Sequence, residues 1–243
     1  MARKRLDVLL VDRGLAESRA KARAAIEAGG VTVDGRVVSK PAETVEETAQ
    51  IAAEPLHPWV GRGALKLDHA LALWPIAVQG RVVLDVGAST GGFTEVCLAR
   101  GAAKVYAVDV GRDQLHPRLR ADPRVVVLEA TDARDLDAKL VPEPPELIAC
   151  DVSFIGVAKA LPCALTLAAP GSDLVTLVKP QFEVGPERVG KGGLVKSAED
   201  RAAALDAVVA FLAGQGWRMR QTCESPILGG AGARELLLWA SRG

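Results

Sequence analysis

The sequence predicts an α/β protein in which a mostly parallel, doubly wound sheet follows a small N-terminal α+β domain. Short apolar runs typical of buried strands alternate with helical stretches from residue 82 onward. Near the N-terminus, glycine and turn signals mark a separate small unit. We expect this first domain over residues 1–50, a linker over 51–62 and the sheet domain over 63–243, since 243 residues suffice for one standard domain and a small one.

The N-terminal domain is expected to contain two short helices followed by strands. A helical apolar stripe begins at Leu6 and ends at Gly14. Ser18 is a favourable N-cap for a second helix over residues 19–28, which Gly29-Gly30 terminates. The following segment, 31–38, is typical of a strand, a tight Asp-Gly turn and a second strand.

Basic residues are concentrated in this domain. Residues 1–40 hold nine of the 30 Lys and Arg residues but only five of the 30 acidic ones, although the whole chain has no net charge. A basic domain on an acidic body suggests contact with a polyanion, and a solvated charged face explains the composition equally well. The candidate residues for binding such a polyanion are Arg3, Arg5, Arg19, Lys21 and Arg23.

The linker contains Pro55, Pro58 and Trp59, which favour a short, stiff segment. After it, the predicted strands are residues 82–86, 105–108, 125–128, 147–150, 174–178 and 235–240. Helical stretches separate several of these strands, among them residues 157–167 and 198–215. This alternation is the pattern of a parallel sheet covered by helices.

Several classes of protein are disfavoured by composition. No apolar run approaches the roughly 20 residues of a membrane helix, and the basic start lacks the apolar stretch of a signal peptide. The four cysteines form no C-x-x-C pair and the three histidines show no ligand spacing. We therefore expect a cytoplasmic protein without a metal site or a membrane partner; the oligomeric state is left open.

A glycine-rich loop lies between the first strand of the sheet and the next helix. Its sequence, LDVGASTGGFT at 84–94, matches neither the dinucleotide pattern nor a phosphate loop. Glycines allow a tight turn and a close approach of the backbone to a ligand at the point where such sheets bind cofactors. An ordinary loop is the alternative. The candidate cofactor-binding residues here are Asp85, Gly87, Ala88, Ser89, Thr90, Gly91, Gly92 and Phe93.

Acidic and basic residues follow four of the predicted strands. Asp109 ends the second strand, 24 positions after Asp85, where a carboxylate can bind ribose hydroxyls; Asp132 is a candidate adenine contact. Asp151 and Lys179 directly follow apolar strands, so both side chains are expected at the carboxyl edge of the sheet. A charge there costs desolvation unless it is paired or functional, and a purely structural ion pair is the alternative.

These motifs resemble known families. Residues 4–45 resemble the small RNA-binding domain of a ribosomal protein. RGALKL (62–67), CDVSFI (150–155), LVKPQFE (177–183) and ARELLLW (233–239) resemble the FtsJ-like ribose 2′-O-methyltransferases. The whole chain is similar to the TlyA, or haemolysin A, family. The resemblance implies a class I, Rossmann-like, seven-stranded methyltransferase domain that uses S-adenosyl-L-methionine to methylate structured RNA, with rRNA or ribosomal subunits as partners and cytidine ribose as target.

The same resemblance implies a catalytic tetrad of Lys66, Asp151, Lys179 and Glu235. In it Lys179 is the base that takes the proton of the ribose hydroxyl, Lys66 orients that hydroxyl, and the two carboxylates hold the lysines. The Glu235 segment lacks the Asn and the aromatic residue that usually flank this Glu in the family. Two alternatives are an inactive RNA-binding assembly factor and a membrane-active haemolysin; the lack of a long apolar segment argues against the second.

Overall fold

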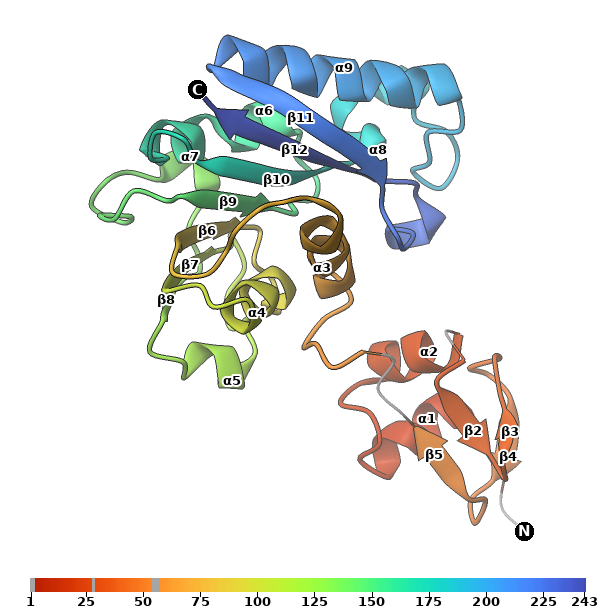
Figure 1. Ribbon diagram of the computed structural model, residues 1–243. Helices are drawn as coiled ribbons and strands as arrows, with labels where there is room; N and C mark the ends of the chain where they lie inside the picture. Colours follow the sequence, from red (N-terminus) through yellow and green to blue (C-terminus); the bar gives the residue numbers. More distant parts are fainter. Residues whose placement is uncertain (1–2, 28, 54–56) are drawn as a thin grey trace. The chain divides into compact units, whose positions relative to one another are not determined.

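The computed structural model describes residues 3–27, 29–53 and 57–243 (Figure 1). The chain divides into two compact units, Met1–Pro58 and Trp59–Gly243. Residues 51–53, assigned to the linker from the sequence, form a strand in the sheet of the first unit. Trp59 and Val60, also assigned to the linker, pack against the core of the second unit. Residues 54–56 of the predicted linker lie outside the described residues.

The first unit packs two helices against short strands. Its elements are β1 (Arg3–Arg5), α1 (Leu6–Asp12), α2 (Arg19–Glu27), β2 (Val31–Val33), β3 (Arg36–Val37), β4 (Thr44–Glu46) and β5 (Ile51–Ala53). β1 pairs with β4, and β2 lies between β3 and β5, all antiparallel. The β2–β3 turn has positive φ at Asp34 and Gly35, as a tight hairpin requires. The last residue of the predicted second helix, residue 28, lies outside the described residues.

A small apolar core holds this unit together. Leu6 and Leu10 of α1, Ile26 of α2 and Val31 of β2 are completely buried. Their spacing puts one face of each helix against the strands, and the charged residues of α2 lie on its exposed face.

The second unit is built on a seven-stranded sheet within residues 57–243, which confirms the predicted fold class. Its strands are β6 (Val82–Val86), β7 (Lys104–Val108), β8 (Val125–Leu128), β9 (Leu147–Cys150), β10 (Asp173–Val178), β11 (Trp217–Glu224) and β12 (Leu236–Arg242). Their order is β11-β12-β10-β9-β6-β7-β8. The five neighbouring strands β10, β9, β6, β7 and β8 are parallel to one another. Strand β12 runs antiparallel to β10 and to β11.

Helices cover both faces of this sheet (Figure 1). The helical segments are α3 (Ala64–Leu73), α4 (Gly92–Ala99), α5 (Pro117–Arg120), η1 (Ala133–Asp135), α6 (Val157–Ala160), α7 (Pro162–Leu167), α8 (Pro180–Glu183), η2 (Pro186–Arg188), α9 (Ala198–Gly214) and η3 (Gly230–Gly232). One core lies under α3 and α4, and a second lies under α6, α7 and α9. Alternate strand residues serve the two cores: Val83 faces the first and Leu84 the second.

Two features of the second unit differ from the sequence prediction. The predicted helix over 157–167 is divided at Leu161 into α6 and α7; Pro162 cannot continue the helical hydrogen bonding. Strand β11 was not predicted, because it is an edge strand whose residues are mostly exposed and polar, so it lacks an apolar run. Among the described residues, no helix is long and apolar enough to cross a membrane.

Candidate active site

The glycine-rich loop connects β6 to α4. Gly87 has a φ of 85°, and a Cβ there would lie 2.9 Å from the backbone oxygen of Asp151. Gly91 has a φ of 95°, and a Cβ there would lie 2.3 Å from Leu119 Cδ1 and 2.7 Å from Leu115 Cδ1. Both positions therefore require glycine. The space beside Gly91 is occupied by the protein's own leucines, whereas the loop sequence suggests room for a ligand there.

Asp85 lies in β6 directly below this loop. It is completely buried, and Thr94 Oγ1 donates a 2.6 Å hydrogen bond to its Oδ2. Burial raises the pKa of the Asp85 carboxyl to about 7, and the Thr94 hydrogen bond opposes that rise. Asp85 thus links the strand to the first turn of α4 and supports the loop from beneath.

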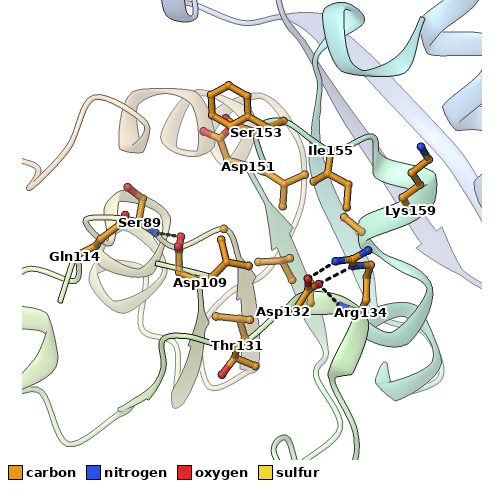
Figure 2. Close-up of a pocket in the computed structure, with 18 residues that line it drawn as sticks. Ser89, Asp109, Gln114, Thr131, Asp132, Arg134, Asp151, Ser153, Ile155 and Lys159 are labelled. Carbon is orange, nitrogen blue, oxygen red and sulfur yellow. Dashed lines mark hydrogen bonds and ion pairs between the residues drawn. The ribbon is translucent and has the colours of Figure 1, made fainter. Parts of the chain in front are cut away.

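A pocket of about 670 Å³ opens at the carboxyl edge of the sheet (Figure 2). Among the predicted cofactor residues, Gly87, Ser89, Asp109 and Asp132 line it, and so does Asp151 of the predicted tetrad. The remaining predicted residues do not line it: Asp85, Ala88, Thr90, Gly91, Gly92 and Phe93. Phe93 instead packs into the core under α3 and α4.

Asp109 follows β7 and lines the pocket beside Ser89 (Figure 2). Its Oδ2 accepts a 2.8 Å hydrogen bond from the amide of Ser89, and its Oδ1 accepts one of 2.7 Å from the amide of Gly111. The first bond ties the glycine-rich loop to the loop after β7, and the second lies within the loop after β7. Each carboxylate oxygen keeps a further lone pair for a ligand.

Asp132 has less capacity for a ligand than Asp109. It caps η1 by accepting from the amide of Arg134 at 2.9 Å, and its Oδ2 forms a 2.6 Å ion pair with the guanidinium of the same Arg134. The Arg134 guanidinium lowers the pKa of Asp132 to about 2. Figure 2 shows both groups at the same wall of the pocket.

The four predicted tetrad residues lie together. Lys66 Nζ is 2.7 Å from Glu235 Oε2 and 3.3 Å from Asp151 Oδ2, and Lys179 Nζ is 2.6 Å from Asp151 Oδ1. Lys66, Lys179 and Glu235 are only 7%, 6% and 4% exposed. Two ammonium groups and two carboxylates therefore form a buried chain of ion pairs in which Asp151 is shared.

Strand topology explains how these residues meet. Asp151 and Lys179 follow the adjacent parallel strands β9 and β10, so both lie at the carboxyl edge. Because β12 is antiparallel to β10, its first residue, Leu236, pairs with Val178. Glu235 therefore lies at the same edge, and Lys66 reaches the cluster from α3.

Two residues next to the tetrad carry no sequence signal of their own. The Oγ of Ser153 accepts a 2.8 Å hydrogen bond from Lys179 Nζ. Phe154 is 91% exposed at the pocket, has a φ of 66°, and its ring centroid lies 5.4 Å from that of Phe182. The CDVSFI motif contains Ser153 and Phe154, but its residue pattern does not predict a role for either.

In the first unit, two of the five predicted RNA-binding residues converge on one acid. Arg5 donates two hydrogen bonds, of 3.0 and 2.8 Å, to the carboxylate of Asp7. Arg19 Nη2 lies 3.2 Å from Asp7 Oδ2. Asp7 is completely buried, and hydrogen bonds from Arg5 hold its pKa well below its usual range. Arg5 and Arg19 remain 45% and 59% exposed.

The other three predicted RNA-binding residues have separate partners. Arg3 donates to the backbone oxygen of Thr44 at 2.7 Å, and Lys21 pairs with Glu17 one turn earlier. Arg23 lies 3.9 Å from Glu27.

Comparisons with known proteins agree with this geometry. The model of the FtsJ-like methyltransferases matches residues 59–242, and that of the S4 domain matches residues 4–51. The 16S/23S rRNA (cytidine-2′-O)-methyltransferase TlyA of Mycobacterium tuberculosis is 48% identical over 242 residues, 98% of this chain and 90% of the relative.

Solved structures show the same architecture. A hemolysin candidate from Streptococcus thermophilus has a TM-score of 0.79 and 37% identity, covering all of this chain and 89% of the other. An S-adenosylmethionine dependent methyltransferase from Mesorhizobium loti has a TM-score of 0.53 and 19% identity over 74% of this chain and 99% of its own, which bears on the fold alone. With one family model matching most of its length and a relative 48% identical along nearly all of it, this chain belongs to the FtsJ-like methyltransferase family.

Proposed function

We propose that this protein transfers a methyl group from S-adenosyl-L-methionine to a ribose 2′-hydroxyl in rRNA. The observation that carries the proposal is the buried ion-pair chain of the tetrad, which meets the pocket at Asp151. The name of the M. tuberculosis relative supports a cytidine as the target nucleotide.

The pocket fits the proposed cofactor in size and chemistry. Its volume of about 670 Å³ suits a nucleoside-sized ligand. Asp109 has spare lone pairs for two ribose hydroxyls, and the glycine-rich loop presents backbone to the remainder of the ligand. When bound, S-adenosylmethionine supplies a methyl group already activated by the sulfonium charge.

The tetrad supplies the acceptor for the proton that the ribose hydroxyl loses. With Lys179 as a neutral amine, Lys66, Asp151 and Glu235 leave the buried cluster with one net negative charge. Uptake of the hydroxyl proton by Lys179 Nζ restores neutrality, which favours the transfer in a desolvated site. Lys66, held by two carboxylates, is fixed to orient the hydroxyl oxygen.

RNA binding is proposed for both units. Arg5 and Arg19 present two exposed guanidinium groups, and both pair with the single carboxylate of Asp7. The group therefore carries one net positive charge at the surface, which can attract RNA phosphates. Phe154 offers an exposed ring at the pocket, and an unstacked RNA base can lie against such a ring. The proposed partner is therefore rRNA, free or in a ribosomal subunit, and the proposed function implies a cytoplasmic location.

The proposal is tested by methyl transfer to rRNA in vitro. Purified protein, S-adenosylmethionine with a labelled methyl group and ribosomal subunits should give label on a ribose 2′-oxygen, mapped by resistance of the adjacent phosphodiester to alkaline cleavage. Label on a base, or none on RNA although the cofactor binds, would contradict the proposal.

A further inference from the structure

The amine of Lys179 has two polar neighbours of different chemistry, an ion-pair partner and a hydrogen-bond acceptor. Asp151 Oδ1 lies 2.6 Å from Nζ, and the hydroxyl oxygen of Ser153 accepts from Nζ at 2.8 Å. Lys179 is 6% exposed, whereas Ser153 is exposed and lines the pocket. Ser153 therefore lies between the buried amine and the space that the ligands would occupy.

These two contacts orient the nitrogen in different ways. An ammonium group has three N–H donors, and the Ser153 hydroxyl oxygen accepts from one of them. Asp151 Oδ1 accepts no hydrogen bond from the described residues and attracts the ammonium group as an ion-pair partner. When one of the other two protons leaves, Ser153 still holds its N–H bond, and the lone pair takes one of the two remaining tetrahedral positions. We propose that Ser153 is a positioning residue that, together with the Asp151 ion pair, orients the amine of Lys179 toward the ribose hydroxyl. This inference rests on the proposed function, in which Lys179 is the base.

A hydroxyl suits this position better than a second carboxylate. Another negative charge beside Nζ would stabilise the ammonium form and oppose loss of its proton. The Ser153 hydroxyl accepts a hydrogen bond while adding no charge, so it orients the amine and still permits the neutral state.

The loop that carries Ser153 is fixed at both ends. At its start, the amide of Asp151 donates to the backbone oxygen of Val86 at 3.0 Å. At its end, the amide of Val157 donates to Glu183 Oε1 at 2.8 Å. A Cβ on Gly156 would lie 3.0 Å from the oxygen of Phe182, so the loop packs closely against α8, the helix that follows Lys179. The Ser153 hydroxyl and the lysine are thus held on connected segments.

A matched pair of variants isolates the hydroxyl. Ser153→Thr keeps it, and Ser153→Val has nearly the same size and shape without it. With saturating cofactor and RNA, we expect the single-turnover rate of the Thr variant to stay within about threefold of wild type. The Val and Ala variants should lose about 10- to 100-fold, the scale expected for a misdirected reacting group. Calorimetric affinity for S-adenosylmethionine should change less than about twofold, because the hydroxyl contacts the lysine.

The outcomes separate this inference from the function on which it rests. Equal rates for the Thr and Val variants would overturn the role of Ser153. Recovery of the Val variant at higher cofactor concentration would also overturn it, because Ser153 would then act in binding. Lys179→Arg tests the base itself: if that variant keeps most of its rate, the proposed mechanism fails whatever Ser153 does.

Discussion

The two units of the molecule each contain a cluster of ion pairs, and the clusters are built in opposite ways. In the tetrad the cations are buried, since the side chains of Lys66 and Lys179 are 9% and 8% exposed. In the first unit the anion is buried: Asp7 is inaccessible, while Arg5 and Arg19 remain about half exposed. Charge is balanced in the first arrangement and positive in the second.

This difference indicates different tasks. A sealed, balanced cluster holds an amine at low exposure, where the gain or loss of one proton changes the charge of the whole group. A buried carboxylate beneath two exposed guanidinium groups fixes their positions and leaves donors free for an outside anion. The first arrangement suits proton transfer, and the second suits phosphate binding.

The largest effect is expected from Lys66→Met. It leaves Glu235 buried without its 2.7 Å cation, which typically costs about 3–5 kcal/mol of folding free energy. It also removes the group that we propose orients the hydroxyl. The free energy of unfolding, measured with urea, and the rate of methyl transfer should both fall sharply.

A second variant separates stability from chemistry. Lys66→Met combined with Glu235→Leu removes both charges and leaves the Lys179–Asp151 pair intact, so stability should largely return while activity stays lost. If activity returned together with stability, the tetrad would be structural, and the contrast between the two clusters would disappear.

A smaller effect is expected from removing the exposed cluster. The triple change Arg5→Gln, Asp7→Asn and Arg19→Gln lowers the charge by one without leaving a buried carboxylate unpaired. RNA affinity should fall, and the slope of log affinity against log salt should flatten by about two if each arginine contacts one phosphate. Cofactor affinity should not change.

The matched control is Arg36→Gln, which also lowers the charge by one and lies in the same unit, paired with Glu43. An equal loss of RNA affinity in the control would mean that net charge alone, and not the Arg5–Arg19 arrangement, accounts for binding.

The smallest effect is expected in the pH dependence of stability. Because Arg5 lowers the pKa of Asp7 from its ordinary 3.8, the carboxylate stabilises the folded unit above that value, and this stabilisation is lost as the pH falls below it. Asp7→Asn should therefore be less stable than wild type near neutral pH, and the difference in stability between the two proteins should narrow progressively as the pH falls below 3.8. Hydrogen exchange of the α1 amides measures the stability of this unit in both proteins. A difference in stability that stays constant over the whole pH range would contradict the prediction.

The contribution of Asp85 to folding stability should change with pH in the opposite direction. Its burial without a cation raises its pKa to about 7, so it remains protonated in the folded state where the unfolded chain is ionised. Its contribution to stability should therefore decrease as the pH rises from about 4 to 7.

Much of the catalytic unit was predictable because its signals are local. Apolar runs gave the parallel strands, and a charged residue directly after such a run lies at the carboxyl edge, as Asp151 and Lys179 do. The position of Glu235 required the family resemblance, since nothing local reveals that β12 runs antiparallel and begins beside Val178.

Several contacts between distant segments were not predictable. The sequence identified Arg5 and Arg19 as separate candidates, but no local pattern reveals that both pair with Asp7. Gly91 requires glycine because of Leu119, which lies in α5. The hydrogen bond between Ser153 and Lys179 spans 26 positions and depends on a loop geometry that no residue pattern encodes.

The central claim is that the buried cluster performs proton transfer through Lys179, and Lys179→Arg tests it most directly. Arginine keeps the positive charge and can still pair with Asp151, but it does not deprotonate in the accessible pH range. Single-turnover methyl transfer by wild type should rise with pH and then level off, whereas the Arg variant should be nearly inactive at every pH while binding both ligands. If the Arg variant keeps most of the wild-type rate, Lys179 acts only as a positive charge and this account of the cluster is wrong.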